Sequence, residues 1–233
     1  MKTLIIIPAY NEGESILKTV NILTKSNKAV DYVIINDGSK DKTKEICIDN
    51  KLNFIDLPNN LGIGGAVQTG YLYALQNDYD IAIQFDGDGQ HDANYIDNLI
   101  KEIKKGADLV IGSRFVENLS EFKSTRLRRL GINFLSWLIK LCTGTKVYDP
   151  TSGFRAVNRD IMKIFADEYP VDYPEPDTIV RIIKKGYKVR EIPVKMNERE
   201  NGTSSINAFK SVYYMIKVSI SIIMSALNTK REK

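Results

Sequence analysis

Two aspartates at the end of an apolar run are the residues of this chain best placed to do chemistry. Asp86 and Asp88 stand on either side of Gly87, directly after the largely apolar run at residues 81–85. The glycines of this stretch let the backbone turn and let a bulky ligand come close. Carboxylates delivered by a buried strand to the edge of a sheet suit a hard divalent cation and the phosphates that it carries. Asp-Gly pairs also form ordinary surface turns, which is the alternative to a binding site.

Other cation and nucleotide motifs do not fit the sequence. An EF-hand calcium loop starting at Asp86 needs glycine at its sixth position, where the chain has His91. A dinucleotide fingerprint starting at Gly62 needs glycine or alanine where the chain has Val67. His91 is the single histidine. We expect a packed or solvated ring there, with a metal-ligand or base role as the alternative.

Short apolar runs alternate with helical stretches and must position these aspartates. Patterns typical of buried strands occur at residues 4–7, 32–35, 54–57, 81–85 and 109–111, and patterns typical of helices at 15–23, 40–49, 62–75 and 93–105. This alternation predicts a mostly parallel sheet flanked by helices. Ligands bind such sheets beyond the carboxyl ends of the strands. Polar clusters follow three of the strands, at residues 8–12, 36–38 and 86–88.

The second half of the chain is less regular. We expect a helix at residues 126–141, a turn-rich loop at 149–155 leading into a short strand, a loop and helix at 172–185, an edge strand at 188–194 and a last helix at 208–227. No internal repeat or linker interrupts it. We therefore predict one domain over residues 1–206, followed by a C-terminal amphipathic helix and basic tail at 207–233.

Composition limits the classes of protein that fit. The chain has 233 residues, is 43% hydrophobic and carries a net charge of +4, which fits anionic small ligands or an acidic membrane surface but does not indicate nucleic acid. Cys47 and Cys142 are too far apart for a cysteine metal motif, and they do not suggest a disulfide framework. We expect no signal peptide and no membrane-spanning helix, and a cytoplasmic location.

Five motifs, in order, resemble those of the family 2 glycosyltransferases. They are IIIPAYNE at residues 5–12, NDGS at 36–39, DGDGQ at 86–90, GSR at 112–114 and DPTSGFR at 149–155. The last motif is similar to the branch that contains dolichyl-phosphate mannose synthase and bacterial polyprenyl-phosphate sugar transferases. The resemblance covers roughly residues 3–206.

The resemblance implies a GT-A fold, with a Rossmann-like central sheet, and a nucleotide-diphosphate sugar donor, uridine being commoner in the family than guanosine. The positions that match donor-binding residues are Pro8, Ala9, Tyr10, Glu12, Asp37, Gly64, Asp86, Gly87 and Asp88. Mg²⁺ or Mn²⁺ would be held by Asp86, Asp88 and Gln90. Such an ion neutralises the charge that develops on the leaving diphosphate, so Asp88 is also expected to be catalytic.

Arginines raise the question of the acceptor. In the resembling branch, arginines near Arg114 and the start of the helix at 126 hold the phosphate of a polyprenyl-phosphate acceptor. Arg114, which we also expect to be catalytic, matches well, and of Arg126, Arg128 and Arg129 we favour Arg129. Basic residues at a helix start oppose the helix dipole, so a bound anion would compensate them, although a solvated helix start is the plain alternative. Residues 199–205 resemble a family loop that closes over the donor diphosphate or the acceptor phosphate, and the resemblance adds Arg199 and Ser204 to the acceptor-phosphate site. A polar surface loop is the plain alternative.

Two further activities stay open. A sugar-hydroxyl acceptor would need a general base, for which Asp177 or Glu175 is placed as in many relatives, whereas a phosphate acceptor needs none. Both acids could instead serve a helix start. A non-catalytic nucleotide-sugar-binding protein is disfavoured by the intact Asp86, Asp88 and Arg114. Inversion at the anomeric carbon is a family expectation, and the sugar is not identified by the sequence.

The last helix has a broad apolar face that something must cover. A narrow polar stripe runs through residues 210–228, and apolar side chains fill the rest. The face could pack on the domain, form a homo-oligomer contact or lie on a membrane beside Lys230, Arg231 and Lys233. A lipid-linked acceptor favours peripheral attachment at the inner face of the cell membrane.

Overall fold

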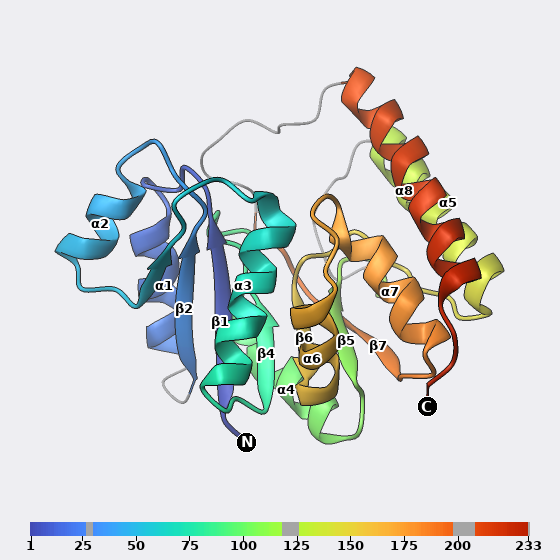
Figure 1. The fold of residues 1–233 in the computed structure, drawn as a ribbon, viewed down its shortest axis with the longest axis horizontal. Helices are drawn as coiled ribbons and strands as arrows, with labels where there is room; N and C mark the ends of the chain where they lie inside the picture. The colour runs from blue at the N-terminus through green and yellow to red at the C-terminus, as the bar shows by residue number, and fades with distance from the viewer. Residues whose placement is uncertain (27–29, 118–125, 198–207, 233) are drawn as a thin grey trace.

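The computed structural model describes residues 1–26, 30–117, 126–197 and 208–232, built around one sheet (Figure 1). The strands are β1 (Thr3–Ala9), β2 (Asp31–Asn36), β3 (Phe54–Asp56), β4 (Ile81–Gln84), β5 (Leu109–Ser113), β6 (Arg155–Asn158) and β7 (Val189–Pro193). The helices are α1 (Ile16–Ser26), α2 (Thr43–Asp49), α3 (Gly62–Gln76), the 3-10 turn η1 (Ala93–Tyr95), α4 (Ile96–Lys104), α5 (Arg126–Thr143), α6 (Arg159–Asp167), α7 (Pro174–Lys184) and α8 (Ala208–Asn228).

The sheet has the strand order β3-β2-β1-β4-β6-β5-β7. All neighbouring strands are parallel except β6, which is antiparallel to both β4 and β5. The predicted mostly parallel sheet is thus confirmed. Because β6 runs the other way, the loop that precedes it lies at the edge where β4 and β5 end.

Two hydrophobic layers cover the two faces of the sheet. Alternate residues of β1 point to opposite faces, with Leu4 and Ile6 in one core and Ile5 and Ile7 in the other. Helices α3, α6 and α7 contribute to the first core, and α1 and α4 to the second. A strand buried on both faces reads as a continuous apolar run, and this is why β1 could be recognised in the sequence.

Two features of the second half differ from the sequence prediction. Helix α6 was not predicted, although Asn158 accepts a hydrogen bond from the Ile161 amide and so caps its first turn, and Met162 and Phe165 pack in the core. The short strand expected after the loop at 149–155 was not assigned a partner. The structure places it as β6 inside the sheet, between β4 and β5.

Helices α5 and α8 lie side by side beyond α7, at the end of the molecule away from β3 (Figure 1). Val218 and Ile222 of α8 and Leu135 and Ile139 of α5 join the core under α7. Other large apolar side chains of both helices face outward. In the part of the chain that the structure describes, no helix combines the length and the apolar character needed to cross a membrane.

Candidate active site

The predicted metal ligands lie directly after β4, at the carboxyl edge of the sheet. The Asp88 carboxylate accepts a hydrogen bond of 3.0 Å from the backbone amide of Gln90, and the Asp86 side chain is one-third exposed. Gly87 between them packs against β1, since a Cβ there would lie 3.3 Å from the Pro8 carbonyl oxygen. Both carboxylates are therefore held where a ligand outside the sheet edge could reach them.

These two carboxylates fit a divalent ion that shares its ligands with a diphosphate. Among the described residues, no three His, Cys, Asp or Glu side chains gather closely enough to hold a metal by themselves. Mg²⁺ is commonly bound through one or two carboxylates, with substrate phosphates and water completing its shell. Asp86 and Asp88 match that pattern, and the Gln90 side chain is near enough in sequence to contribute an oxygen.

His91 supports Asp86 from behind. Its Nδ1 accepts a hydrogen bond of 3.0 Å from the Asp86 amide, and its Nε2 lies 3.4 Å from an Asp86 carboxylate oxygen. The buried ring stacks on Phe154, with centroids 4.8 Å apart, and meets Phe85 edge to face. The sequence predicts a packed or solvated ring at His91, and the structure shows a packed one. Its contacts with Asp86 help to fix that residue.

The residues expected to hold the nucleoside lie at the end of β1 and directly after β1 and β2. Pro8 and Ala9 are buried at the end of β1, whereas the Tyr10 side chain is exposed. The Glu12 carboxylate accepts a hydrogen bond of 2.6 Å from the Ser15 hydroxyl. Tyr10 is thus the member of this group most open to a ligand.

Asp37 and Gly64 shape the start of α3. The buried Asp37 carboxylate accepts a hydrogen bond of 2.7 Å from the Leu61 amide, and burial raises its pKa. A Cβ at Gly64 would lie 2.0 Å from the Pro170 carbonyl oxygen, so only glycine fits this close approach. The structure gives both residues a structural role beside the donor-binding role that the resemblance implies.

A buried arginine and Glu175 lie close enough to each other to interact electrostatically. Arg155, fully buried in β6, donates to the Ser152 and Glu175 carbonyl oxygens at 2.6 and 3.1 Å. It also donates to the Thr178 hydroxyl at 3.0 Å. Burial raises the pKa of Glu175; the positive charge of Arg155 opposes the rise and the negative charge of Asp86 adds to it. Glu175 is therefore electrostatically coupled to the metal-ligand side of the site.

Asp177, the other acid considered as a base, is turned toward α8. Its buried carboxylate accepts hydrogen bonds from the hydroxyls of Ser221, at 2.9 Å, and Ser225, and lies 2.8 Å from Arg181 Nε. The carboxylate thus ties α7 to α8. These contacts offer no support for the predicted catalytic role, and of the two acids Glu175 is the better candidate base.

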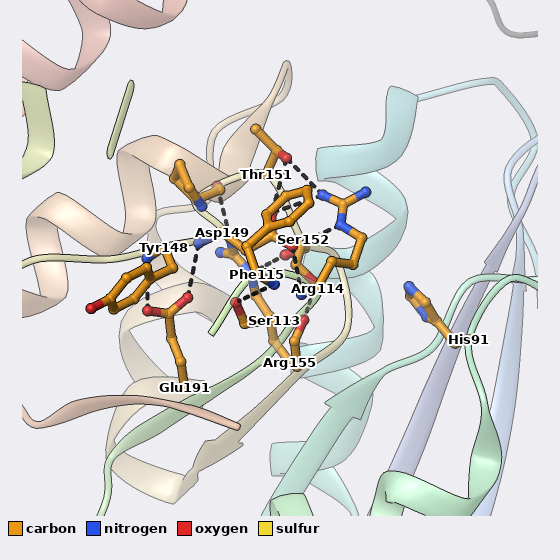
Figure 2. Close-up of polar contacts among 12 residues, drawn as sticks. His91, Ser113, Arg114, Phe115, Tyr148, Asp149, Thr151, Ser152, Arg155 and Glu191 are labelled. Atoms are coloured by element: carbon orange, nitrogen blue, oxygen red, sulfur yellow. Dashed lines mark hydrogen bonds and ion pairs between the residues drawn. The ribbon is translucent and has the colours of Figure 1, made fainter. Parts of the chain in front are cut away.

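Arg114 is buried and forms an ion pair with one carboxylate, that of Asp149 (Figure 2). Its Nε and Nη2 donate to the two oxygens of Asp149, both at 2.7 Å, and Nη2 also donates to the Thr151 hydroxyl at 2.9 Å. Burial alone would raise the pKa of Asp149, but its hydrogen bonds to Arg114 and the arginine's charge outweigh that effect and hold the pKa below its ordinary value. The sequence prediction included Arg114 but missed this partner.

Two guanidinium groups lie over the ring of Phe115, the residue after Arg114, and a third is close enough to interact with Arg114. The Arg129 guanidinium lies 3.7 Å from the centre of the Phe115 ring, and that of Arg114 lies 5.2 Å from it. Arg129 Nη1 is buried and has no hydrogen-bond partner among the described residues. Burial and the charge of Arg114 lower the pKa of Arg128. Arg128 thus interacts with Arg114, and we call Arg114, Arg128 and Arg129 the arginine group.

One loop joins the arginine group to the aspartate pair. Thr151 contacts Arg114, and two residues later a Cβ at Gly153 would lie 3.3 Å from an Asp86 carboxylate oxygen. The two halves of the predicted site thus meet along this loop. Arg199 and Ser204, the other expected phosphate ligands, lie outside the described residues.

Comparison with known proteins agrees with this geometry. Glycosyl transferase family 2 matches at residues 4–165. The UDP-N-acetylglucosamine–dolichyl-phosphate N-acetylglucosaminyltransferase of Methanococcus voltae is 32% identical, over 94% of this chain and 97% of its own. The polyprenol monophosphomannose synthase of Mycolicibacterium smegmatis is 28% identical, over 94% of this chain and 86% of its own. The undecaprenyl-phosphate mannosyltransferase of Micrococcus luteus is also 28% identical, over 89% and 88%.

A solved structure shares the fold. The glucosyl-3-phosphoglycerate synthase of Mycobacterium tuberculosis, crystallised with Mn²⁺, UDP and phosphoglyceric acid, superposes with a TM-score of 0.72 at 17% identity. The superposition covers 97% of this chain and 78% of that one. At so low an identity the likeness establishes the fold alone. The family match, the relatives and the fold agree, and the chain is a glycosyltransferase that belongs to glycosyl transferase family 2.

Proposed function

We propose that this enzyme transfers a sugar from a nucleotide-diphosphate sugar to the phosphate of a polyprenyl phosphate, with Mg²⁺ or Mn²⁺ as cofactor. The observation that carries the proposal is the arginine group: Arg114 and Arg129 lie over Phe115, Arg128 interacts with Arg114, and one buried Arg129 nitrogen has no partner among the described residues. The loop through Thr151 and Gly153 connects this group to Asp86. Guanidinium groups suit phosphate, and a buried donor without a partner is costly unless a ligand satisfies it. Two of the three relatives above are named for dolichyl phosphate or undecaprenyl phosphate, and the third is named as a synthase of polyprenol monophosphomannose.

The residues divide the work between the two substrates. Asp86 and Asp88 would hold the metal ion, which supplies charge neutralisation for the departing nucleoside diphosphate when it is bound. Arg114, Arg128 and Arg129 would hold the acceptor phosphate. In the transfer, a phosphate oxygen forms a bond to the anomeric carbon from the face opposite the diphosphate, whose bond to that carbon breaks. This displacement inverts the anomeric centre, and the phosphate anion needs no base.

A transfer assay tests the proposal directly. GDP-mannose, UDP-glucose and UDP-N-acetylglucosamine are each incubated with a short polyprenyl phosphate, in Mn²⁺ or in EDTA. We expect one donor to be consumed, with metal, and a polyprenyl-phosphate sugar to form. Transfer to the matching polyprenol alcohol at an equal rate would contradict the proposal, because the arginine group would then have no phosphate to bind.

Arg129 provides the sharper version of this assay. Arg129→Gln removes one charged contact to the acceptor phosphate, so the acceptor KM should rise about tenfold or more while the donor KM stays unchanged. Arg190→Gln, a surface arginine of β7 paired with Glu102, is the matched control. An unchanged acceptor KM in Arg129→Gln would remove Arg129 from the acceptor site.

A hydroxyl acceptor is the second candidate activity, favoured by the raised pKa of Glu175 near Asp86. A base with a raised pKa is better matched to taking a proton from a sugar hydroxyl. Glu175→Gln separates the two candidates. Turnover with a polyprenyl phosphate should be unchanged, whereas a hydroxyl transferase would lose about a hundredfold or more.

We further propose that the outer faces of α5 and α8 lie on an anionic membrane surface. Exposed apolar side chains cover both helices: Leu127, Leu130, Phe134, Trp137 and Leu141 on α5, and Val212, Tyr213, Ile216, Ile220, Ile223, Met224 and Leu227 on α8. Exposed Lys140, Lys230 and Arg231 accompany them. Paired apolar and basic surface of this kind suits lipid, and the proposed acceptor is itself a lipid.

Vesicle sedimentation tests this surface. The chain should bind vesicles of phosphatidylcholine with phosphatidylglycerol, and bind less to phosphatidylcholine alone. Serine at both Trp137 and Ile220 should weaken binding, whereas serine at exposed Val171, outside both helices, should not. A stable dimer in solution that the Trp137 and Ile220 changes dissociate, with no vesicle binding, would assign the surface to a second copy instead.

A further inference from the structure

Glu191 of β7 holds the backbone on which Asp149 stands. One of its carboxylate oxygens accepts a hydrogen bond of 2.7 Å from the Tyr148 amide, and the other accepts one of 2.9 Å from the Asp149 amide (Figure 2). The Ser113 hydroxyl is a further hydrogen-bond partner of this carboxylate. One side chain thus fixes two consecutive peptide groups at the start of the loop at residues 148–154.

The same contact continues to Arg114. The backbone amide of Asp149 donates to Glu191. The two carboxylate oxygens of Asp149 accept hydrogen bonds from the Arg114 guanidinium, and one of them also accepts a hydrogen bond of 3.1 Å from the Arg114 backbone amide. Ser113 ends β5 immediately before Arg114, and β5 pairs with β7 so that Ile111 stands opposite Glu191. Asp149 therefore connects Glu191 to the Arg114 guanidinium.

The charges explain why this arrangement depends on hydrogen bonding. Burial raises the pKa of Glu191, as does the nearby negative charge of Asp149, while the amides of Tyr148 and Asp149 and the Ser113 hydroxyl lower it. Two carboxylates side by side repel each other unless each is satisfied by donors. Glu191 uses backbone amides for this, which leaves the carboxylate of Asp149 to Arg114.

We propose that Glu191 is a positioning residue for acceptor binding: it fixes Asp149, and through Asp149 it orients the Arg114 guanidinium toward the acceptor phosphate. This inference rests on the proposed function, in which Arg114 and Arg129 bind that phosphate. Glu191 does not touch the substrate in this role. Its removal should therefore affect the acceptor and leave the donor side, which is built on β1, β2 and β4, unchanged.

Glu191→Gln is the variant that tests it. An amide nitrogen cannot accept a hydrogen bond, so one of the two backbone amides would lose its acceptor and face another donor. We expect the acceptor KM for a short polyprenyl phosphate to rise about tenfold, the effect of losing one charged hydrogen bond, with the donor KM unchanged. Arg190→Gln, the neighbouring residue on β7, should change neither KM.

A double-mutant comparison separates positioning through Asp149 from a general loss of stability. Asp149→Asn should raise the acceptor KM, and adding Glu191→Gln should raise it no further, because both changes break one chain of contacts. If the effects of the two changes multiply, or if Glu191→Gln lowers Tm and weakens Mn²⁺–UDP binding without a selective change in acceptor KM, Glu191 has a structural role only.

Arg129→Gln, measured in parallel, distinguishes failure of this inference from failure of the proposed function. If Arg129→Gln raises the acceptor KM and Glu191→Gln does not, the positioning role is wrong and the acceptor site stands. If Arg129→Gln leaves the acceptor KM unchanged, the proposed phosphate site is wrong and the role of Glu191 in it falls as well.

Discussion

The carboxylates after β4 are held by bonds within a few residues of the chain, whereas the Arg114 side chain is held by a carboxylate from a distant loop. Asp88 accepts from the amide of Gln90, two positions away. Arg114 and Asp149 are 35 positions apart. The hydrogen bonds that fix the aspartate pair are thus mostly local to the end of β4. The acceptor side exists only when separate segments have come together, and it should be the more sensitive to a single change.

The largest expected effect tests this sensitivity at the buried ion pair. Arg114→Met leaves the Asp149 carboxylate buried without its partner, which should cost about 3–5 kcal/mol in the free energy of unfolding. Urea unfolding measures it. The matched control is the double variant Arg114→Met with Asp149→Leu, which should recover most of the loss because no unpaired charge remains. A loss of the same size in the control would contradict the ion-pair explanation.

The next effect concerns the donor side and should appear in turnover rather than in stability. Asp88→Asn weakens metal binding to the diphosphate, so kcat/KM should fall about a hundred- to a thousandfold, or roughly 3–4 kcal/mol of transition-state stabilisation. Steady-state transfer in Mn²⁺ measures it, and Tm should hardly move. Asp97→Asn, at an exposed position of α4, is the control. Full activity of Asp88→Asn would remove the aspartate from the metal site.

A smaller effect should separate packing from catalysis on α7. Asp177→Asn weakens the contacts to Arg181, Ser221 and Ser225, and should cost about 1–3 kcal/mol in stability. The kcat for transfer should be unchanged in the folded protein. Asp172→Asn, which loses a solvent-exposed ion pair with Lys217 of α8, should change the stability much less. A large fall in kcat for Asp177→Asn would restore its predicted role as a base.

The smallest effect is a gain in stability. An acid whose pKa is raised by folding binds its proton more readily in the folded state, so its ionisation opposes folding at neutral pH. Glu175, with an ordinary pKa of 4.5 that burial raises, is such an acid. Glu175→Gln should therefore raise Tm at pH 7, and the gain should vanish as the pH falls through the folded pKa toward the ordinary one. Thermal melts across this pH range measure it, and an equal gain at every pH would exclude the titration of Glu175 as its cause.

The sequence was most informative where structure is local. Strands β1, β2 and β4 are short apolar runs, and the polar residues that follow them meet at one sheet edge because parallel strands end together. This reasoning located Asp86 and Asp88 without knowledge of any long-range contact. The GT-A fold itself came from the motif resemblance.

Long-range partners could not be read in the same way. Asp149 lay in a recognised motif, but nothing in its neighbourhood indicates a bond to Arg114, and Glu191 appeared only as part of an edge strand. Asp177 looked like a first-turn acid or a base, because its partners Ser221 and Ser225 lie far along the chain. Helix α6 was missed although Asn158 and the spacing of Ile161 and Phe165 are helix signals; the strand pattern just before them obscured its start.

The position of β6 has a consequence for the order in which the enzyme forms. Ile81 of β4 pairs with Asn158 of β6, and Leu109 of β5 pairs with Val189 of β7. The part of the sheet formed by β4, β6, β5 and β7 therefore closes through contacts between segments that are synthesised at very different times. Such pairings are slow because a long loop must be ordered first. During synthesis, β1 to β4 are free to associate while the pairing edge of β4 is still open. A nascent chain should therefore acquire its carboxylate pair well before its arginines find their partners, and should need protection of the β4 edge until β6 arrives.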